Sequence, residues 1–167
     1  TPLLINRFGR QQGKAFAKNW GLKQSWEETD LYLFLDGDEV LAENCIFEFV
    51  TQFLKHPETI GALYSNQILL DNGQEREMLL PSYRRDHLVK SIASPVIMAV
   101  KSAIDSVGIF DVCLPALNQY DMLLRISEHF SIAHIPEVLL SKPVRFQQPE
   151  DDEIQYLRQK TQKRMNE

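Results

Sequence analysis

Apolar residues are grouped along the chain in short continuous runs that alternate with longer stripes of helical spacing. The clearest run is Leu31–Leu35, five consecutive apolar residues that end abruptly in charged ones. Continuous hydrophobicity is typical of a strand covered on both faces, as in a parallel sheet beneath helices. A second buried strand is predicted at Leu3–Ile5. Helices are predicted over Arg10–Gly21, with its glycine as the stop, and over residues 42–54.

The second half of the chain mixes strands, turns and short helices. Ile60–Leu70 and Arg76–Leu80 flank the turn Asp71-Asn72-Gly73, a pattern that predicts a β-hairpin. The other predicted elements are a helix around His87–Ile92, a strand at Val96–Val100, a helix at Ser102–Val107 ended by Gly108, a helix at Tyr120–Glu128, short strands at Ile132–Ile135 and Val138–Leu140 around Pro136, and an exposed helix over residues 151–165. These elements predict an α/β layered domain over residues 1–150, followed by an exposed C-terminal helix in 151–167.

The composition is that of a folded protein with a mildly acidic surface. Of 167 residues, 44% are hydrophobic, and the net charge of −5 argues against a nucleic-acid or anionic-lipid surface, which needs clustered Lys and Arg. No apolar stretch approaches the roughly 20 residues of a transmembrane helix. No signal peptide opens the chain, so we predict a cytoplasmic location without a transmembrane segment. Cys45 and Cys113 are too few for a disulfide framework or a structural zinc site.

Candidate chemistry lies in Asp36-Gly37-Asp38, directly after the Leu31–Leu35 run. Open α/β sheets bind ligands beyond the carboxyl ends of their strands, so the position suits a site. Two acids this close repel each other unless a cation is present, and hard carboxylate oxygens suit Mg²⁺ or Mn²⁺. The alternative is a polar strand-end turn in which Gly37 supplies backbone freedom and both acids face water.

Several segments, taken in order, resemble elements of family-two inverting glycosyltransferases. They are Gly13–Leu22 (GKAFAKNWGL), similar to the family's G-x-A-x-A-R-N-x-G stretch; Leu31–Leu41 (LYLFLDGDEVL), similar to its strand ending in D-x-D; Gly108–Asp111, similar to its G-x-F-D element; Leu114–Arg125 (LPALNQYDMLLR), similar to its acceptor-side segment; and Ile132–Leu139 (IAHIPEVL), similar to the strand that follows. The resemblance spans roughly residues 3–145, and several elements in the right order are more specific than any one of them.

The resemblance implies a partial GT-A-type fold, a three-layer α/β/α sandwich with a mixed sheet. It also implies inverting transfer of a sugar from a nucleotide-diphosphate donor to a saccharide or other hydroxyl acceptor, with Mn²⁺ or Mg²⁺ held by Asp36 and Asp38. The residues predicted to bind substrate are Lys18, Asn19, Asp36, Gln119 and Arg125. Inversion needs a carboxylate that deprotonates the acceptor hydroxyl, and Asp121 is the candidate. Arg125 lies four residues beyond Asp121, so an ion pair between them is an equal alternative to substrate contact.

Three departures from the family pattern support a second hypothesis. Gln119 stands where the family has a carboxylate, and an amide is not a useful proton acceptor. The family's late Arg-x-His element is Arg145-Phe146-Gln147 here, and Gln is a poorer metal ligand than His. About two strand–helix units of the family have no counterpart before Leu3. The alternatives are therefore a degenerate or partial domain that acts as a binding or assembly module, completed by a second copy or a partner chain, and a fragment of a longer enzyme, which the missing initiator Met also suggests.

Overall fold

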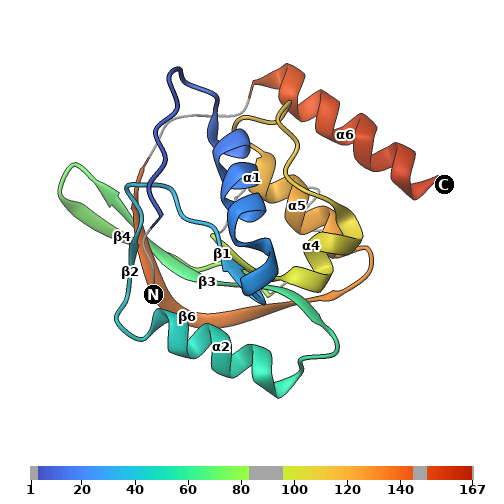
Figure 1. Cartoon of the computed structure of the whole chain (residues 1–167). Helices are drawn as coiled ribbons and strands as arrows, with labels where there is room; N and C mark the ends of the chain where they lie inside the picture. Colours follow the sequence, from blue (N-terminus) through green and yellow to red (C-terminus); the bar gives the residue numbers. More distant parts are fainter. Residues whose placement is uncertain (1–3, 83–95, 145–149, 167) are drawn as a thin grey trace.

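The computed structural model describes residues 4–82, 96–144 and 150–166. Its elements are α1 (Lys14–Ser25), η1 (Trp26–Glu28), β1 (Leu31–Leu33), β2 (Val40–Leu41), α2 (Cys45–Lys55), β3 (Ile60–Asp71), β4 (Gln74–Met78), β5 (Ile97–Val100), α4 (Lys101–Val107), α5 (Asn118–Ile126), β6 (Ser131–Pro143) and α6 (Asp151–Met165). A mixed sheet separates α2 from α1, α4 and α5 (Figure 1). The predicted three-layer α/β/α sandwich is confirmed. The helix predicted around His87–Ile92 and the Arg145–Gln147 element lie outside the described residues.

The sheet has six strands in the order β1-β5-β3-β6-β2, and β4 pairs with the distal half of β3. The neighbours β3 and β6 run parallel, and the other described pairs are antiparallel. The predicted hairpin forms between β3 and β4. Asn72 and Gly73 both have positive φ, 48° and 81°, as a two-residue type I′ turn requires.

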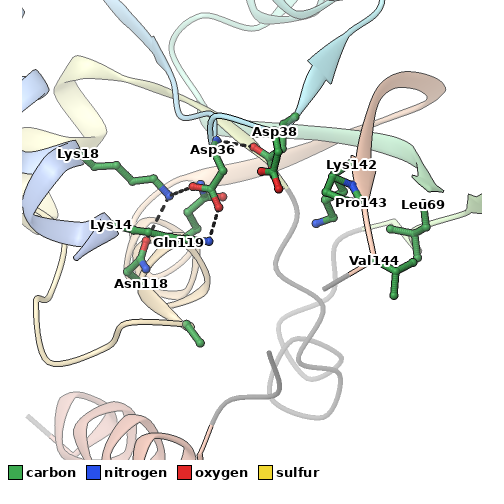
Figure 2. Close-up of a pocket in the computed structure, with 12 residues that line it drawn as sticks. Lys14, Lys18, Asp36, Asp38, Leu69, Asn118, Gln119, Lys142, Pro143 and Val144 are labelled. Carbon is green, nitrogen blue, oxygen red and sulfur yellow. Dashed lines mark hydrogen bonds and ion pairs between the residues drawn. The ribbon is translucent and has the colours of Figure 1, made fainter. Parts of the chain in front are cut away.

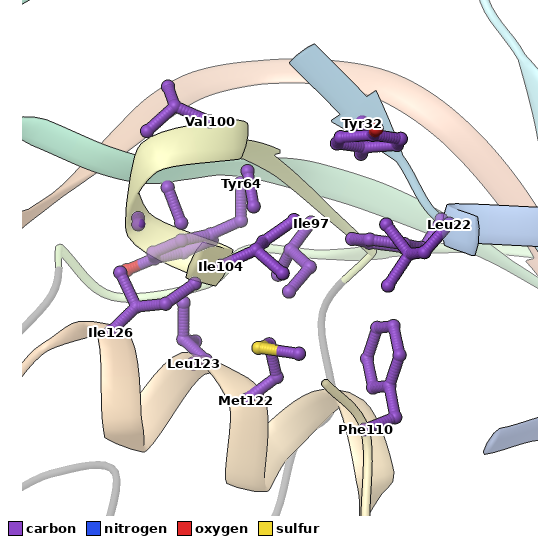
Figure 3. Close-up of a cluster of buried hydrophobic side chains, with 14 of the residues drawn as sticks. Leu22, Tyr32, Tyr64, Ile97, Val100, Ile104, Phe110, Met122, Leu123 and Ile126 are labelled. Carbon is purple, nitrogen blue, oxygen red and sulfur yellow. The ribbon is translucent and has the colours of Figure 1, made fainter. Parts of the chain in front are cut away.

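Each face of the sheet carries its own apolar core. On the face of α1, α4 and α5, side chains from those helices pack on strand residues such as Tyr64 and Ile97, as Figure 3 shows. On the opposite face, Cys45 and Phe49 of α2 are fully buried against the sheet. Burial raises the pKa of the Cys45 thiol to about 11, which fits an inert core residue.

The first three residues of the Leu31–Leu35 run form the strand β1, but the inference of parallel pairing for it is wrong. β1 pairs with β5 in antiparallel register, Tyr32 opposite Ala99. Tyr32 faces the core of α1, α4 and α5, whereas Leu33 faces the core of α2. Coverage of both faces by helices, and not strand direction, therefore accounts for the continuous apolar run.

The predicted N-terminal elements are only partly correct. Leu4 and Ile5 are 64% and 79% exposed and belong to no strand, since no neighbouring strand in the described structure offers them hydrogen bonds. The predicted helix begins later, at Lys14 after Gly13, and it continues past Gly21 to Ser25. Burial of Leu22 in the core favours this extension over a stop at the glycine.

The two short strands predicted around Pro136 are one strand, β6. Ile135 pairs with Ser65 and Val138 with Asn66, so an irregularity in β6 accommodates Pro136 and Glu137. Proline has no N–H to donate to a ladder, and a bulge allows the strand to continue past it. No helix in the described ranges combines the length and apolar character needed to cross a membrane. The cytoplasmic location stays a prediction.

The C-terminal helix forms over the predicted residues but is not exposed on all sides. Glu153, Leu157 and Thr161 are spaced four apart and are buried. Leu157 joins a third apolar cluster with residues that precede and belong to α5. The prediction of an exposed helix missed this stripe because a single leucine among charged residues gives a weak apolar signal.

Gly61 in β3 is expected to tolerate no side chain. A Cβ there would lie 2.4 Å from Phe130 Cβ and 2.7 Å from Ile126 Cγ2. Gly61→Ala should lower the free energy of unfolding by about 1–3 kcal/mol through overpacking. Gly21→Ala is the matched control: the site is open and helical, so alanine should raise stability by about 0.5–1 kcal/mol. Urea unfolding that places both variants at wild-type stability would contradict this steric argument.

Candidate functional site

An open cleft of about 230 Å³ lies beyond the carboxyl end of β1 (Figure 2). Its walls come from α1, from the segment after β1, from the start of α5 and from the ends of β3 and β6. The lining residues are Lys14, Lys18, Asp36, Asp38, Glu39, Leu69, Ala116, Asn118, Gln119, Lys142, Pro143 and Val144. The structure thus brings together four of the residues singled out in the sequence, namely Lys18, Asp36, Asp38 and Gln119.

Asp36 lies in a charged network on one side of the cleft. Its carboxylate accepts a hydrogen bond from Lys14 Nζ at 2.5 Å and lies 3.5 Å from Lys18 Nζ. Its backbone N–H donates to Glu39 Oε2 at 2.7 Å. Burial raises the pKa of the Asp36 carboxyl, but the Lys14 hydrogen bond and the two ammonium charges together lower it below its usual value. Asp36 is therefore an ionised carboxylate that is paired with the ammonium groups of Lys14 and Lys18.

Two lysines of the cleft are held in partly dehydrated positions. Burial lowers the pKa of Lys18 and of Lys142, against the opposing charges of Asp36 and Glu39 respectively. Burial likewise raises the pKa of the Glu39 carboxyl. Figure 2 shows Asp38 between Asp36 and Lys142, so cations flank the acid pair. An anion bound here would favour the charged form of both lysines.

The start of α5 forms the uncharged wall of the cleft. Gln119 Nε2 donates to the carbonyl oxygen of Phe34 at 3.4 Å, next to the acid segment. The amide oxygen of Asn118 accepts from Lys18 Nζ at 3.4 Å, and its nitrogen donates to the Pro115 carbonyl at 2.9 Å. This wall therefore places two amide side chains at the cleft. Substrate binding by Gln119 stays a prediction.

Asn19, predicted to bind substrate, is not among the lining residues. Its side-chain nitrogen donates to the Phe110 carbonyl and its oxygen accepts from the Phe110 N–H, both at 2.9 Å. Both ends of the amide are thus used to hold α1 against the loop before α5. The structure thus gives Asn19 a role in joining two backbone segments, and its contact with substrate stays a prediction.

Asp121 and Arg125 also lie away from the cleft, inside an ion-pair cluster. Asp121 is 0% exposed, and its Oδ2 accepts from Arg125 Nε at 2.9 Å. Arg125 also donates to three backbone carbonyls, those of Val107, Gly108 and Ile109. A fully buried, ion-paired carboxylate does not reach an acceptor hydroxyl in this conformation, so the structure supports the ion-pair alternative over a catalytic Asp121 and a substrate-binding Arg125.

Among the polar residues of the cleft, the sequence argument missed four: Lys14, Glu39, Asn118 and Lys142. Lys14 lies four residues before Lys18, on the same helical face, and that spacing could have revealed it. Glu39 and Asn118 are sequence neighbours of predicted residues. Lys142 carried no local signal, because the pairing of β6 with β3, in which Lys142 lies opposite Leu69, brings it to the cleft.

No group of three His, Cys, Asp or Glu side chains suited to a metal ion occurs in the part of the chain that the structure describes. The acid pair therefore offers at most part of a coordination shell. The assignment of Asp36 and Asp38 as metal ligands stays a prediction.

Comparison with known proteins identifies solved structures that share this fold. No protein-family model and no curated protein matches the chain. Structures of S. aureus TarS, a glycosyltransferase, do match it. TarS 1–349 aligns with a TM-score of 0.63 at 15% identity over 78% of this chain. Its complex with UDP gives 0.60 at 15% over 80%, and a further TarS structure gives 0.57 at 15% over 80%.

The chain accounts for only part of these neighbours. It spans 40% of the two TarS 1–349 chains and 25% of the third. At this identity the likeness concerns the fold alone. The described residues therefore form a partial α/β fold like that of a glycosyltransferase.

Proposed function

We propose that the cleft binds the diphosphate of a nucleotide-sugar donor and that the chain is the metal-binding and acceptor-side part of an inverting, GT-A-type glycosyltransferase. The observation that carries the proposal is the convergence of Asp36, Asp38 and three lysines on one open cleft beyond the end of β1. The fold likeness to TarS supports it, because one of the matching TarS structures is a complex with UDP.

The residues present fit Mn²⁺ or Mg²⁺. Mg²⁺ at phosphate sites is usually bound by one or two carboxylates together with substrate phosphates, and not by an all-protein cage. Asp36 and Asp38 provide two such carboxylates. In the absence of a metal ion, the ammonium groups of Lys14 and Lys18 are the cationic partners of Asp36. A bound divalent ion would supply neutralisation of charge on the leaving diphosphate.

The protein's own cations would hold the donor phosphates directly. Lys14 and Lys18 lie beside Asp36, so a metal ion that binds this carboxylate would compete with both ammonium groups for its oxygens. Phosphate oxygens are the natural new partners for these lysines. Lys142 approaches from β6, on the other side of Asp38. We place the acceptor, a saccharide or another hydroxyl compound, over the 110–125 region, whose Asn118 and Gln119 face the cleft.

Calorimetric titration with UDP tests the proposal. The chain should bind UDP in the presence of Mn²⁺, and EDTA should weaken this binding by about tenfold or more. A tenfold loss corresponds to about 1.4 kcal/mol of binding free energy. UMP, which has the same base and ribose but lacks a diphosphate, is the matched ligand control and should bind weakly in both conditions. Absence of any Mn²⁺-dependent binding of UDP and of other nucleoside diphosphates would exclude this function for the chain.

A second candidate function is a binding or assembly module. Gln119 puts an amide where an inverting enzyme needs a base, and β1 ends the sheet with one edge unpaired among the described strands. Exposed strand edges are sites of pairing with another chain. Light scattering after size exclusion distinguishes the two: a dimer, or a stable complex with a partner chain, supports a module, and a monomer that binds UDP supports the donor site.

A further inference from the structure

A residue from α6 binds the turn directly before α5. Glu153 Oε1 accepts hydrogen bonds from the backbone N–H groups of Ala116 at 2.9 Å and Leu117 at 2.7 Å. No side chain at the N-cap of α5 itself makes such a bond. Both N–H groups belong to the turn that precedes Asn118, the first residue of α5, and the positive end of the helix dipole favours a carboxylate there. Glu153 provides this carboxylate although it follows Leu117 by 36 residues.

Ion pairs and apolar contacts hold α6 in the position from which Glu153 reaches α5. Lys160 Nζ lies 2.7 Å from Asp111 Oδ2 and 3.2 Å from Asp121 Oδ2, so it joins α6 to both ends of the 111–121 segment. Arg164 pairs with Glu128 at 3.1 Å. The apolar contacts are those of Leu157 and Ile154 with Leu114, Leu117, Tyr120 and Leu124.

The turn that Glu153 binds is also a wall of the cleft. Ala116, Asn118 and Gln119 line the cleft, and Glu153 binds the backbone within and beside this stretch. Glu153 itself is 8% exposed and is not a lining residue. Any shift of this turn would move the two amide side chains relative to Phe34 and Lys18, their partners across the cleft.

We propose that α6 is a latch that fixes the α5 wall of the cleft, and that Glu153 is a positioning residue for ligand binding. The proposal rests on the proposed function, since the ligand is a nucleoside diphosphate. Coupling of this kind is reciprocal: a ligand that binds better when α6 is docked also makes α6 dock more tightly, by the same factor. α6 should therefore respond to a ligand that it does not touch.

The test combines hydrogen–deuterium exchange with calorimetric titration of UDP and Mn²⁺ on the full chain. Glu153→Ala removes both hydrogen bonds, so amides 114–120 should exchange faster in the ligand-free protein and UDP affinity should fall by about tenfold. Glu153→Gln keeps an oxygen that accepts both bonds, so it should retain most of the affinity. Asp152→Ala is the matched control, because it removes an exposed acid from the same helical turn. In the wild type, UDP should slow amide exchange in α6.

The outcomes separate this inference from the proposed function. Unchanged exchange and unchanged affinity in Glu153→Ala would overturn the latch, as would a Gln variant as weak as the Ala variant. If Glu153→Ala does not fold, the wild-type measurement decides: UDP binding without slower exchange in α6 contradicts the coupling. If the wild type binds no nucleotide but Glu153→Ala still accelerates exchange at 114–120, the contact between Glu153 and this turn stands and the proposed function fails.

Discussion

Asparagine in place of Asp38 is expected to remove the Mn²⁺-dependent part of UDP binding. At saturating Mn²⁺ the affinity for UDP should fall by about 100-fold, close to 2.7 kcal/mol, because one of only two predicted protein carboxylate ligands is lost. Asn and Asp have nearly the same shape, so the cleft wall is preserved. The lost charge is then the cause of the change. Calorimetric titration of UDP at several fixed Mn²⁺ concentrations measures it.

The same variant should behave in the opposite way without metal. In EDTA, Asp38→Asn is expected to bind UDP at least as tightly as the wild type, because one negative charge fewer faces the diphosphate beside Lys14, Lys18 and Lys142. Glu43→Gln makes the same charge change at an exposed position close in the sequence and outside the cleft, and should leave both affinities unchanged. An equal loss with and without Mn²⁺ would show that Asp38 contacts the nucleotide or shapes the site, and would contradict a metal-ligand role.

The parts of the fold that could be predicted are those that depend on neighbours in the sequence. The hairpin turn followed from Asn72 and Gly73, whose backbone preferences alone specify it. The cleft position of Asp36 and Asp38 followed from the end of a buried strand, because that edge of an α/β sheet is where ligands bind. In both cases the determining information lies within a few residues.

Two residues predicted to bind substrate, Asn19 and Arg125, lie outside the cleft and contact the backbone of other segments. Asn19 binds the backbone of Phe110, which is 91 residues away in the sequence. Arg125 donates hydrogen bonds to backbone carbonyls at the end of α4 and directly after it. A sequence motif indicates which residue type is required but not whether its partner is a substrate or the chain's own backbone. Lys142 was missed for the same reason, since strand pairing alone brings it to the cleft.

Loss of the Asp121 charge is expected to destabilise the fold more than any other single change considered. Asp121 is surrounded by Arg125 at 2.9 Å, Lys160 at 3.2 Å and Arg164 at 3.8 Å. Asp121→Asn leaves these cations without their shared counter-charge. Breaking a buried ion pair from one side typically costs about 3–5 kcal/mol, so the free energy of unfolding should fall by this amount. In urea the midpoint should drop while the slope is unchanged.

Two further variants identify the cause of this loss. Asp105→Asn makes the same chemical change on the exposed side of α4 and should alter stability by less than about 0.5 kcal/mol. Adding Lys160→Met to Asp121→Asn should recover part of the stability, because it removes one of the cations that share Asp121 and couples to the first change. A catalytic Asp121 predicts the reverse pattern, a variant of wild-type stability that binds donor but transfers no sugar. Urea unfolding of Asp121→Asn alone therefore decides between the structural and the catalytic role, and the burial and pairing of this carboxylate favour the first.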